Sequence, residues 1–196
     1  MRFAEREFTY GCRYPDRPAR RSFRVHAPKR AGARLMARDL LDPANARTAI
    51  ENLMFTYAER IDAGDLDGLA ALFEHGRILD TEGNVQGEGV AGVRAIYEAA
   101  TKIHADGTPM TQHVTSNLIL EFADDMRSAE VRSRCTVMQA LPPDFPLQPI
   151  ITNYYEDKFA YDETRGWHFV ERKMIPKLLG DLSKHLKYDI AQVLPE

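Results

Sequence analysis

The stretch TQHVTSNLILEF, residues 111–122, reads as a β-strand, and its two faces differ in character. Alternation places Val114, Ser116, Leu118, Leu120 and Phe122 on one face, and His113, Thr115, Asn117 and Ile119 on the other. The second face mixes polar and apolar side chains, which is typical of the wall of a ligand cavity. A single histidine on a strand is also compatible with a solvent-exposed or purely structural residue.

Three more segments downstream, 128–141, 149–161 and 166–175, read as strands because they are rich in Val, Ile, Thr, Tyr and Phe. The proline-rich LPPDFPLQP separates two of them and predicts a loop over 141–149. Upstream, apolar residues recur at helical spacing over 44–61, 65–73 and 90–104, with a short strand over 77–81. Helices followed by a run of antiparallel strands predict an α+β fold, with a curved sheet wrapped around N-terminal helices.

The 196 residues, 44% of them hydrophobic, suffice for one sizeable core, and we expect a single domain over 44–176. Residues 1–43 form a basic arm with the composition of a disordered segment, unless translation starts at Met36. Residues 1–35 hold nine Arg and one Lys against three acids, about +7. Residues 177–196 form a tail, and its leucines predict a further helix over 177–191.

Several function classes are disfavoured. The chain has no run of 18 apolar residues and no signal-peptide pattern, so we expect a cytoplasmic protein without a membrane segment. Nucleic acid is not an expected partner, because the basic arm lacks interleaved aromatic residues on a recognisable fold. Cys12 and Cys135 form no C-x-x-C pair, and the six histidines show no metal-ligand spacing. The glycines of QGEGVAG, 86–92, lack the parallel βαβ unit of a dinucleotide site.

Asp62 is the most unusual residue of the first helical pattern. It continues the apolar stripe four residues after Ala58, at the helix C-terminus, where the macrodipole disfavours a negative charge. One explanation is ordinary turn chemistry in Asp62-Ala63-Gly64-Asp65. The other is that Asp62 points into a pocket and holds His113, fixing its tautomer and making it a better base.

Three segments resemble the SnoaL-like group of the nuclear transport factor 2-like superfamily: YAERIDAGDLDGLAALF, TQHVTSNLILEF and TNYYEDKFAYDETRGWHFVERKM. The resemblance covers residues 44–175 and is closest to members such as scytalone dehydratase, hexachlorocyclohexane dehydrochlorinase and the bile-acid dehydratase. It implies a cone-shaped α+β barrel and an Asp–His dyad in its cavity, without metal or organic cofactor. The matching residues are Asp62 and His113. Tyr57 matches a pocket tyrosine, and Asn153 approximately matches a pocket asparagine.

The resemblance implies a lyase, a dehydratase or dehydrohalogenase, in which His113 is the base, Asp62 stabilises its imidazolium and Tyr57 donates a hydrogen bond. The substrate is expected to be small, apolar or cyclic. Its predicted contacts are Asn153, Met54, Phe73, Ile119, Met138, Tyr155 and Trp167, although plain core packing also explains the apolar ones. An isomerase like ketosteroid isomerase, a polyketide cyclase and a non-catalytic binding or dimerisation module are the alternatives. The resemblance also suggests a homodimer or homotrimer.

Overall fold

The computed structural model describes residues 41–189, all within one compact unit, Leu35–Glu196. The predicted basic arm up to residue 40, the alternative start at Met36 and the last residues of the predicted tail, 190–196, lie outside the described residues.

Three helices form where the apolar spacing predicts them. α1, Pro43–Asp62, begins at Asp42, whose side chain accepts hydrogen bonds from the backbone of the first turn. α2, Leu66–Ala71, is short, and Asp65 before it caps the helix by accepting a hydrogen bond from the Gly68 N–H. α3, Gly89–Ala100, starts at a glycine with φ +63° and ends four residues before the predicted end.

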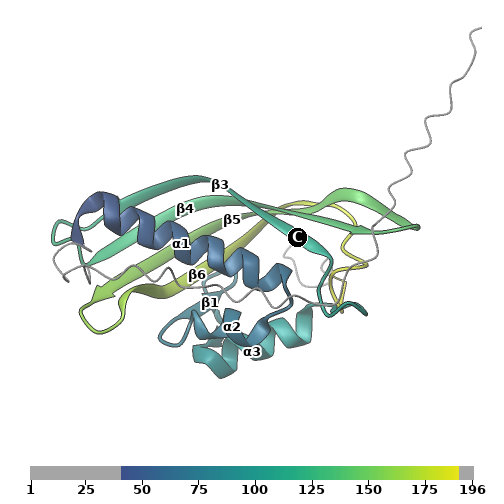
Figure 1. Ribbon diagram of the computed structural model, residues 1–196, viewed down its shortest axis with the longest axis horizontal. Helices are drawn as coiled ribbons and strands as arrows, with labels where there is room; N and C mark the ends of the chain where they lie inside the picture. The colour runs from purple at the N-terminus through teal and green to yellow at the C-terminus, as the bar shows by residue number, and fades with distance from the viewer. Residues whose placement is uncertain (1–40, 190–196) are drawn as a thin grey trace, which may run out of the picture. The chain divides into compact units, whose positions relative to one another are not determined.

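Six strands form one mixed sheet in the order β2-β1-β6-β5-β4-β3. The strands are β1 Arg77–Leu79, β2 Val85–Glu88, β3 Thr111–Phe122, β4 Ser128–Leu141, β5 Phe145–Asp162 and β6 Gly166–Leu179. Neighbours are antiparallel except for β1 and β6, which are parallel. α1 runs along the face of the long, curved strands (Figure 1), so the predicted α+β fold is confirmed. β2 was not among the predicted strands.

The main core lies between the helices and this face of the sheet. The buried stripe of α1 packs against α2, α3, Phe73 in the turn after α2, and the inward strand side chains, among them Val131, Phe159 and Phe169. A second cluster contains Cys135, Val137, Phe145, Ile150, Ile151, Tyr155 and Leu182. Helical periodicity therefore decided which face of α1 is buried, as amphipathic patterns generally do.

β3 does not alternate as its sequence predicts. Its register with β4 shifts between Ser116 and Ile119, and Asn117 has a left-handed φ of 55°. An extra residue in one strand of a pair reverses the faces of all the residues beyond it. His113 and Leu118 therefore share the inner face, while Ile119, expected beside His113, points away and is 52% exposed.

The predicted loop over 141–149 and the predicted helix over 177–191 are both wrong in the described residues. β4 reaches Leu141 and β5 already begins at Phe145, which leaves a short turn. β6 continues to Leu179 and pairs with β5, so Leu178 is 70% exposed instead of packed. Pairing with a preformed sheet satisfies the backbone groups of this segment, and this outweighs a weak helical pattern.

Candidate active site

The turn after α1 brings Asp62 to the start of β3. Gly64 has a φ of +71°, and a Cβ on it would lie 2.2 Å from the Gly107 carbonyl oxygen. Glycine is therefore needed there both for the left-handed backbone and for the close approach of the loop that leads into β3. This approach lets the last residue of α1 contact the first residues of the strand.

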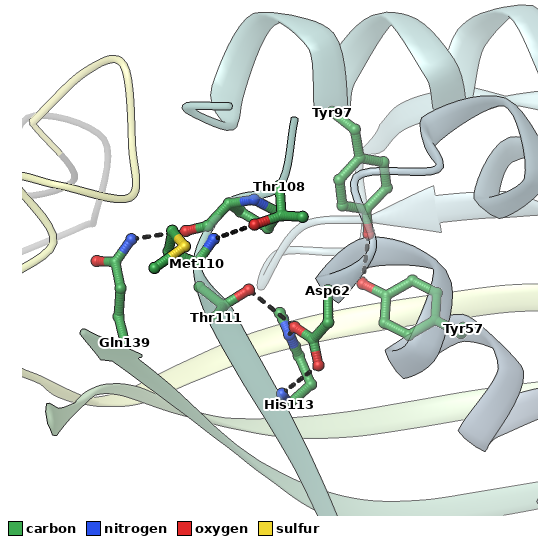
Figure 2. A network of polar contacts seen from close by, with 9 residues as sticks. Tyr57, Asp62, Tyr97, Thr108, Met110, Thr111, His113 and Gln139 are labelled. Atoms are coloured by element: carbon green, nitrogen blue, oxygen red, sulfur yellow. Dashed lines mark hydrogen bonds and ion pairs between the residues drawn. The ribbon is translucent and has the colours of Figure 1, made fainter. Parts of the chain in front are cut away.

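Asp62 and His113 form a hydrogen-bonded pair (Figure 2). His113 Nδ1 lies 2.6 Å from Asp62 Oδ1, and the His113 backbone N–H donates to Oδ2 at 2.7 Å. The Thr111 hydroxyl donates to Oδ1 at 2.8 Å. Burial by itself raises the pKa of Asp62, but the hydrogen bonds and charge of His113 outweigh it and lower the pKa below its ordinary value. Asp62 is thus an anion that holds the imidazole by Nδ1.

His113 also lines a cavity of about 410 Å³. Within residues 41–189, His113 Nε2 makes no hydrogen bond, and the His113 side chain is only 7% exposed. A partly enclosed imidazole with one nitrogen held by a carboxylate and the other unbound has the arrangement of a general base. A second hollow, of about 450 Å³, is lined mainly by charged side chains and contains neither residue of the pair.

Four predicted site residues line the cavity of His113, and five predicted contacts do not. Tyr57, His113, Asn153 and Tyr155 are in its wall, which is otherwise mostly apolar. Met54, Phe73 and Trp167 are buried in the main core instead, away from the cavity. Met138 and Ile119 are absent from the wall because their strands turn them to the other face of the sheet. These five placements correct the predicted substrate contacts.

Tyr57 and Tyr97 share a hydrogen bond in the cavity wall (Figure 2). Their hydroxyl oxygens lie 2.5 Å apart, and either can be the donor. Burial raises the pKa of Tyr57 and raises that of Tyr97 further, so both phenols are neutral at ordinary pH. Whichever hydroxyl accepts this hydrogen bond keeps its own O–H. The Tyr97 O–H lies 3.9 Å from Met174 Sδ, a weak acceptor, so a stronger acceptor on a ligand can take its place.

A buried cation lies behind these aromatic rings. Arg172 forms a two-bond ion pair with Asp157, Nε to Oδ1 and Nη2 to Oδ2, each at 2.8 Å. Its guanidinium carbon lies 4.1 Å from the Tyr57 ring centre and 4.5 Å from that of Tyr155. Burial opposes the charge, but Asp157 outweighs it and raises the pKa of Arg172. A positive charge therefore lies directly behind the part of the cavity wall that Tyr57 and Tyr155 form.

Tyr97, Thr111, Arg172 and His185 belong to the site or its support and were not predicted. Thr111 could have been found, because it lies on the same strand face as His113. Arg172 could not, because strand alternation breaks at Glu171 and Arg172, where both residues are buried. His185 was hidden by the wrong helix assignment of the tail. No group of three or more metal-ligating side chains occurs in residues 41–189.

Comparisons with known proteins agree on the fold. Residues 42–173, more than half of the chain, match the SnoaL-like domain family. A candidate scytalone dehydratase from Novosphingobium aromaticivorans superposes with a TM-score of 0.55 at 24% identity, over 69% of this chain and 87% of that one. LinA superposes with a TM-score of 0.57 at 19% identity, over 76% and 95%.

A Nostoc punctiforme protein of unknown function with a cystatin-like fold gives a TM-score of 0.54 at 17% identity, over 67% of this chain and 90% of that one. The search of curated proteins found no match. At these identities the solved structures establish the fold, and the chemistry has to be argued from the residues themselves.

Proposed function

The chain belongs to the SnoaL-like domain family of the nuclear transport factor 2-like superfamily, and on that premise we propose that it is a cofactor-independent lyase, a dehydratase or dehydrohalogenase. The observation that carries the proposal is the Asp62–His113 pair at 2.6 Å with the His113 ring in a cavity wall. In the proposal, His113 is the general base and Asp62 holds it in the reactive tautomer.

The elimination begins at His113 Nε2. This nitrogen takes a proton from a substrate carbon made acidic by a neighbouring carbonyl, and the electron pair of that C–H bond becomes a new C=C bond. The leaving group departs from the adjacent carbon with its own electron pair, as halide or as hydroxide that takes up a proton to become water. Asp62 stabilises the imidazolium that forms, because its negative charge lies one hydrogen bond away.

The tyrosine pair supports this chemistry from the same wall. Negative charge develops on the carbonyl oxygen or on the leaving group, and the free O–H of Tyr57 or Tyr97 can donate to it. The positive charge of Arg172 also favours negative charge on the substrate, because its guanidinium carbon lies 4.1 Å from the centre of the Tyr57 ring in the cavity wall. We assign the donor role to Tyr57 and Tyr97 jointly, since one hydrogen bond couples their hydroxyl groups and either can be its donor.

The cavity suits a small substrate with an apolar body. Its volume of about 410 Å³ falls near the lower end of the roughly 300–1,000 Å³ common for ligand pockets. Ile61, Ile96, Val137, Ile151, Leu182 and Leu186 supply apolar wall, and Asn153 is among the few polar side chains. One ring or two fused rings with few polar substituents fit such a wall best.

A matched pair of probes tests the reaction. β-Hydroxycyclohexanone and β-chlorocyclohexanone differ only in leaving group, and elimination from either gives cyclohexenone, whose formation is followed by ultraviolet absorbance. We expect the wild-type protein to accelerate at least one of these eliminations, and His113→Ala and Asp62→Asn to remove the acceleration while leaving the protein folded. His75→Ala is the control, because His75 is largely exposed and outside the cavity.

Proton exchange in deuterium oxide separates the competing functions. Exchange next to the carbonyl of cyclohexanone that requires His113, without elimination from either probe, would favour an isomerase or cyclase over a lyase. Probe binding without exchange or turnover would favour a non-catalytic binding module. Elimination that persists at the wild-type rate in His113→Ala would show that the dyad is not the catalyst.

Two further expectations stay predictions. A homodimer or homotrimer is testable by light scattering on the purified full chain. A cytoplasmic location is testable by fractionating cells, and no helix in residues 41–189 is long and apolar enough to cross a membrane.

A further inference from the structure

Residues 180–189, which we call the cover segment, close one side of the cavity that His113 lines. The segment pairs with the chain that follows α3, with a β-bridge between Thr101 and Leu186 and a 2.7 Å hydrogen bond from the Lys102 N–H to the His185 carbonyl. The Gln139 amide donates to the carbonyl of Lys184 at 3.1 Å. These bonds join the cover segment to two other parts of the fold, so its side chains have defined positions.

Besides the half-exposed Tyr188, the cover segment contributes one buried polar side chain to the cavity wall, that of His185. The residue is only 9% exposed, and its Nδ1 is enclosed without a hydrogen-bond partner. Nε2 makes no hydrogen bond within residues 41–189 either. Burial, with a smaller effect of the nearby His113, lowers the pKa of His185 to about 4, so the imidazole is neutral near pH 7. A buried neutral imidazole without any partner needs an explanation.

We propose that His185 anchors the substrate, hydrogen-bonding to a hydroxyl or carbonyl oxygen while His113 removes the proton. This inference rests on the proposed function, because it concerns the same cavity, and it narrows the substrate class. Small cyclic alcohols and ketones satisfy the imidazole, whereas hydrocarbons and halocarbons without oxygen do not. A halogenated ketone satisfies the imidazole as well, so His185 selects for an oxygen on the substrate and not for the leaving group.

The chemistry of a neutral imidazole supports this assignment. It carries one N–H and one lone pair, so it can donate to a carbonyl oxygen or accept from a hydroxyl, depending on its tautomer. A buried polar nitrogen without a partner is unfavourable, so a ligand that supplies an oxygen recovers free energy that an apolar ligand cannot. The neighbouring side chains Leu182 and Leu186 are apolar, and Tyr188, which is 47% exposed, makes no hydrogen bond to His185.

Binding of three ligands of nearly equal shape tests the proposal. α-Tetralone and α-tetralol carry one oxygen on two fused rings, and tetralin has the same rings without oxygen. We expect the wild-type protein to bind the two oxygenated compounds roughly two- to tenfold more tightly than tetralin, the range of one net hydrogen bond. His185→Phe should remove this preference. Lys184→Ala should keep it, because the Lys184 side chain is exposed in the same segment.

Nuclear magnetic resonance of histidine-labelled wild-type protein gives a readout that does not depend on the folding of a variant. The ring nitrogen signals of His185 should shift with α-tetralone and stay unchanged with tetralin. The proposal is overturned if wild-type protein shows no preference for oxygen or binds none of the three ligands, if His185→Phe keeps the preference, or if the His185 signals do not respond.

The same titrations separate this inference from the proposed function. His113→Ala should bind α-tetralone with the wild-type preference over tetralin, because His185 is intact. A variant that loses elimination but keeps the preference for oxygenated ligands therefore reports on His113 as the base. A variant that keeps elimination but loses this preference reports on His185 as the anchor.

Discussion

His113 Nδ1 lies 2.6 Å from Oδ1 of Asp62, and the backbone N–H of His113 donates to the second oxygen of the same carboxylate at 2.7 Å. One carboxylate therefore contacts a residue at two points, its ring and its backbone. The backbone N–H can only donate, so it requires an acceptor at the Oδ2 position whatever replaces Asp62. This fixes the orientation of any amide placed there.

Asp62→Asn should reverse the tautomer of His113. Its carbonyl oxygen takes the position facing the backbone N–H, so its NH₂ group faces Nδ1 and donates to it. The ring proton then moves to Nε2, which can no longer act as a base. We expect proton removal to fall by about 10²–10⁴-fold, the usual contribution of a general base, and nitrogen chemical shifts to report the other tautomer.

Thr111→Val is the matched control for that variant. It removes the hydroxyl that donates to Asp62 Oδ1 at 2.8 Å but leaves the carboxylate and both contacts to His113. The tautomer should be that of the wild-type protein, and activity should fall by less than in Asp62→Asn, at most by the roughly 10–100-fold that one hydrogen bond to a charged group contributes. Equal losses in the two variants would contradict the tautomer argument.

Stability at low pH should depend on Asp62. Its folded-state pKa is lowered, so its stabilisation is complete above the unfolded value of about 3.9 and is lost as the pH falls through the lower folded value. Urea unfolding between pH 7 and pH 2 should therefore show a smaller loss of stability for Asp62→Asn than for the wild-type protein. Parallel pH profiles for the two proteins would show that the carboxylate is not stabilised by His113 and Thr111.

The stability of the fold should depend on Arg172 and Asp157 being present together. Both side chains are almost completely buried, so Asp157→Asn or Arg172→Met leaves one charge without its partner. Each single variant should lower the free energy of unfolding by about 3–5 kcal/mol, and the double variant should recover much of this loss. Urea denaturation measures all three, and single variants within about 1 kcal/mol of the wild-type protein would contradict the assignment.

The reversal of faces in β3 should depend on the residue at position 117. Asn117 has a φ of 55°, which glycine tolerates and a β-branched side chain does not. Asn117→Gly should leave stability nearly unchanged, whereas Asn117→Val should cost about 1–2 kcal/mol. Thermal or urea unfolding measures the difference, and equal stability of the two variants would show that the bulge is not present in solution.

Local patterns and the family resemblance together predicted much of the candidate site. The stripe of α1 and the turn after it marked Asp62 as an unusual carboxylate, and the strand pattern of 111–122 placed His113 on a face with polar neighbours. The structure brings these two side chains together as expected, while their catalytic role stays a prediction. Tyr57 and Asn153 were also expected in the cavity, and they line it.

Two of the errors share one physical cause. Ile119 was placed in the cavity because strict alternation was assumed beyond Asn117, and the bulge that breaks it depends on pairing with β4. The predicted helix of the tail failed because Leu178 and Leu179 pair with β5 instead. In both places a partner distant in the sequence outweighed the local preference.

By itself, the sequence determined the three N-terminal helices, the long strands and the α+β class, because periodicity and turn chemistry act over a few neighbouring residues. The pairing of Asp62 with His113 was an expectation from the resemblance to the SnoaL-like group. Tertiary structure alone decided which side chains share the cavity. His185 enters it from the cover segment, and Arg172 lies behind its tyrosines, because sheet register and backbone bonds between distant segments place them there. Such placements depend on contacts across the whole domain, which no local pattern encodes.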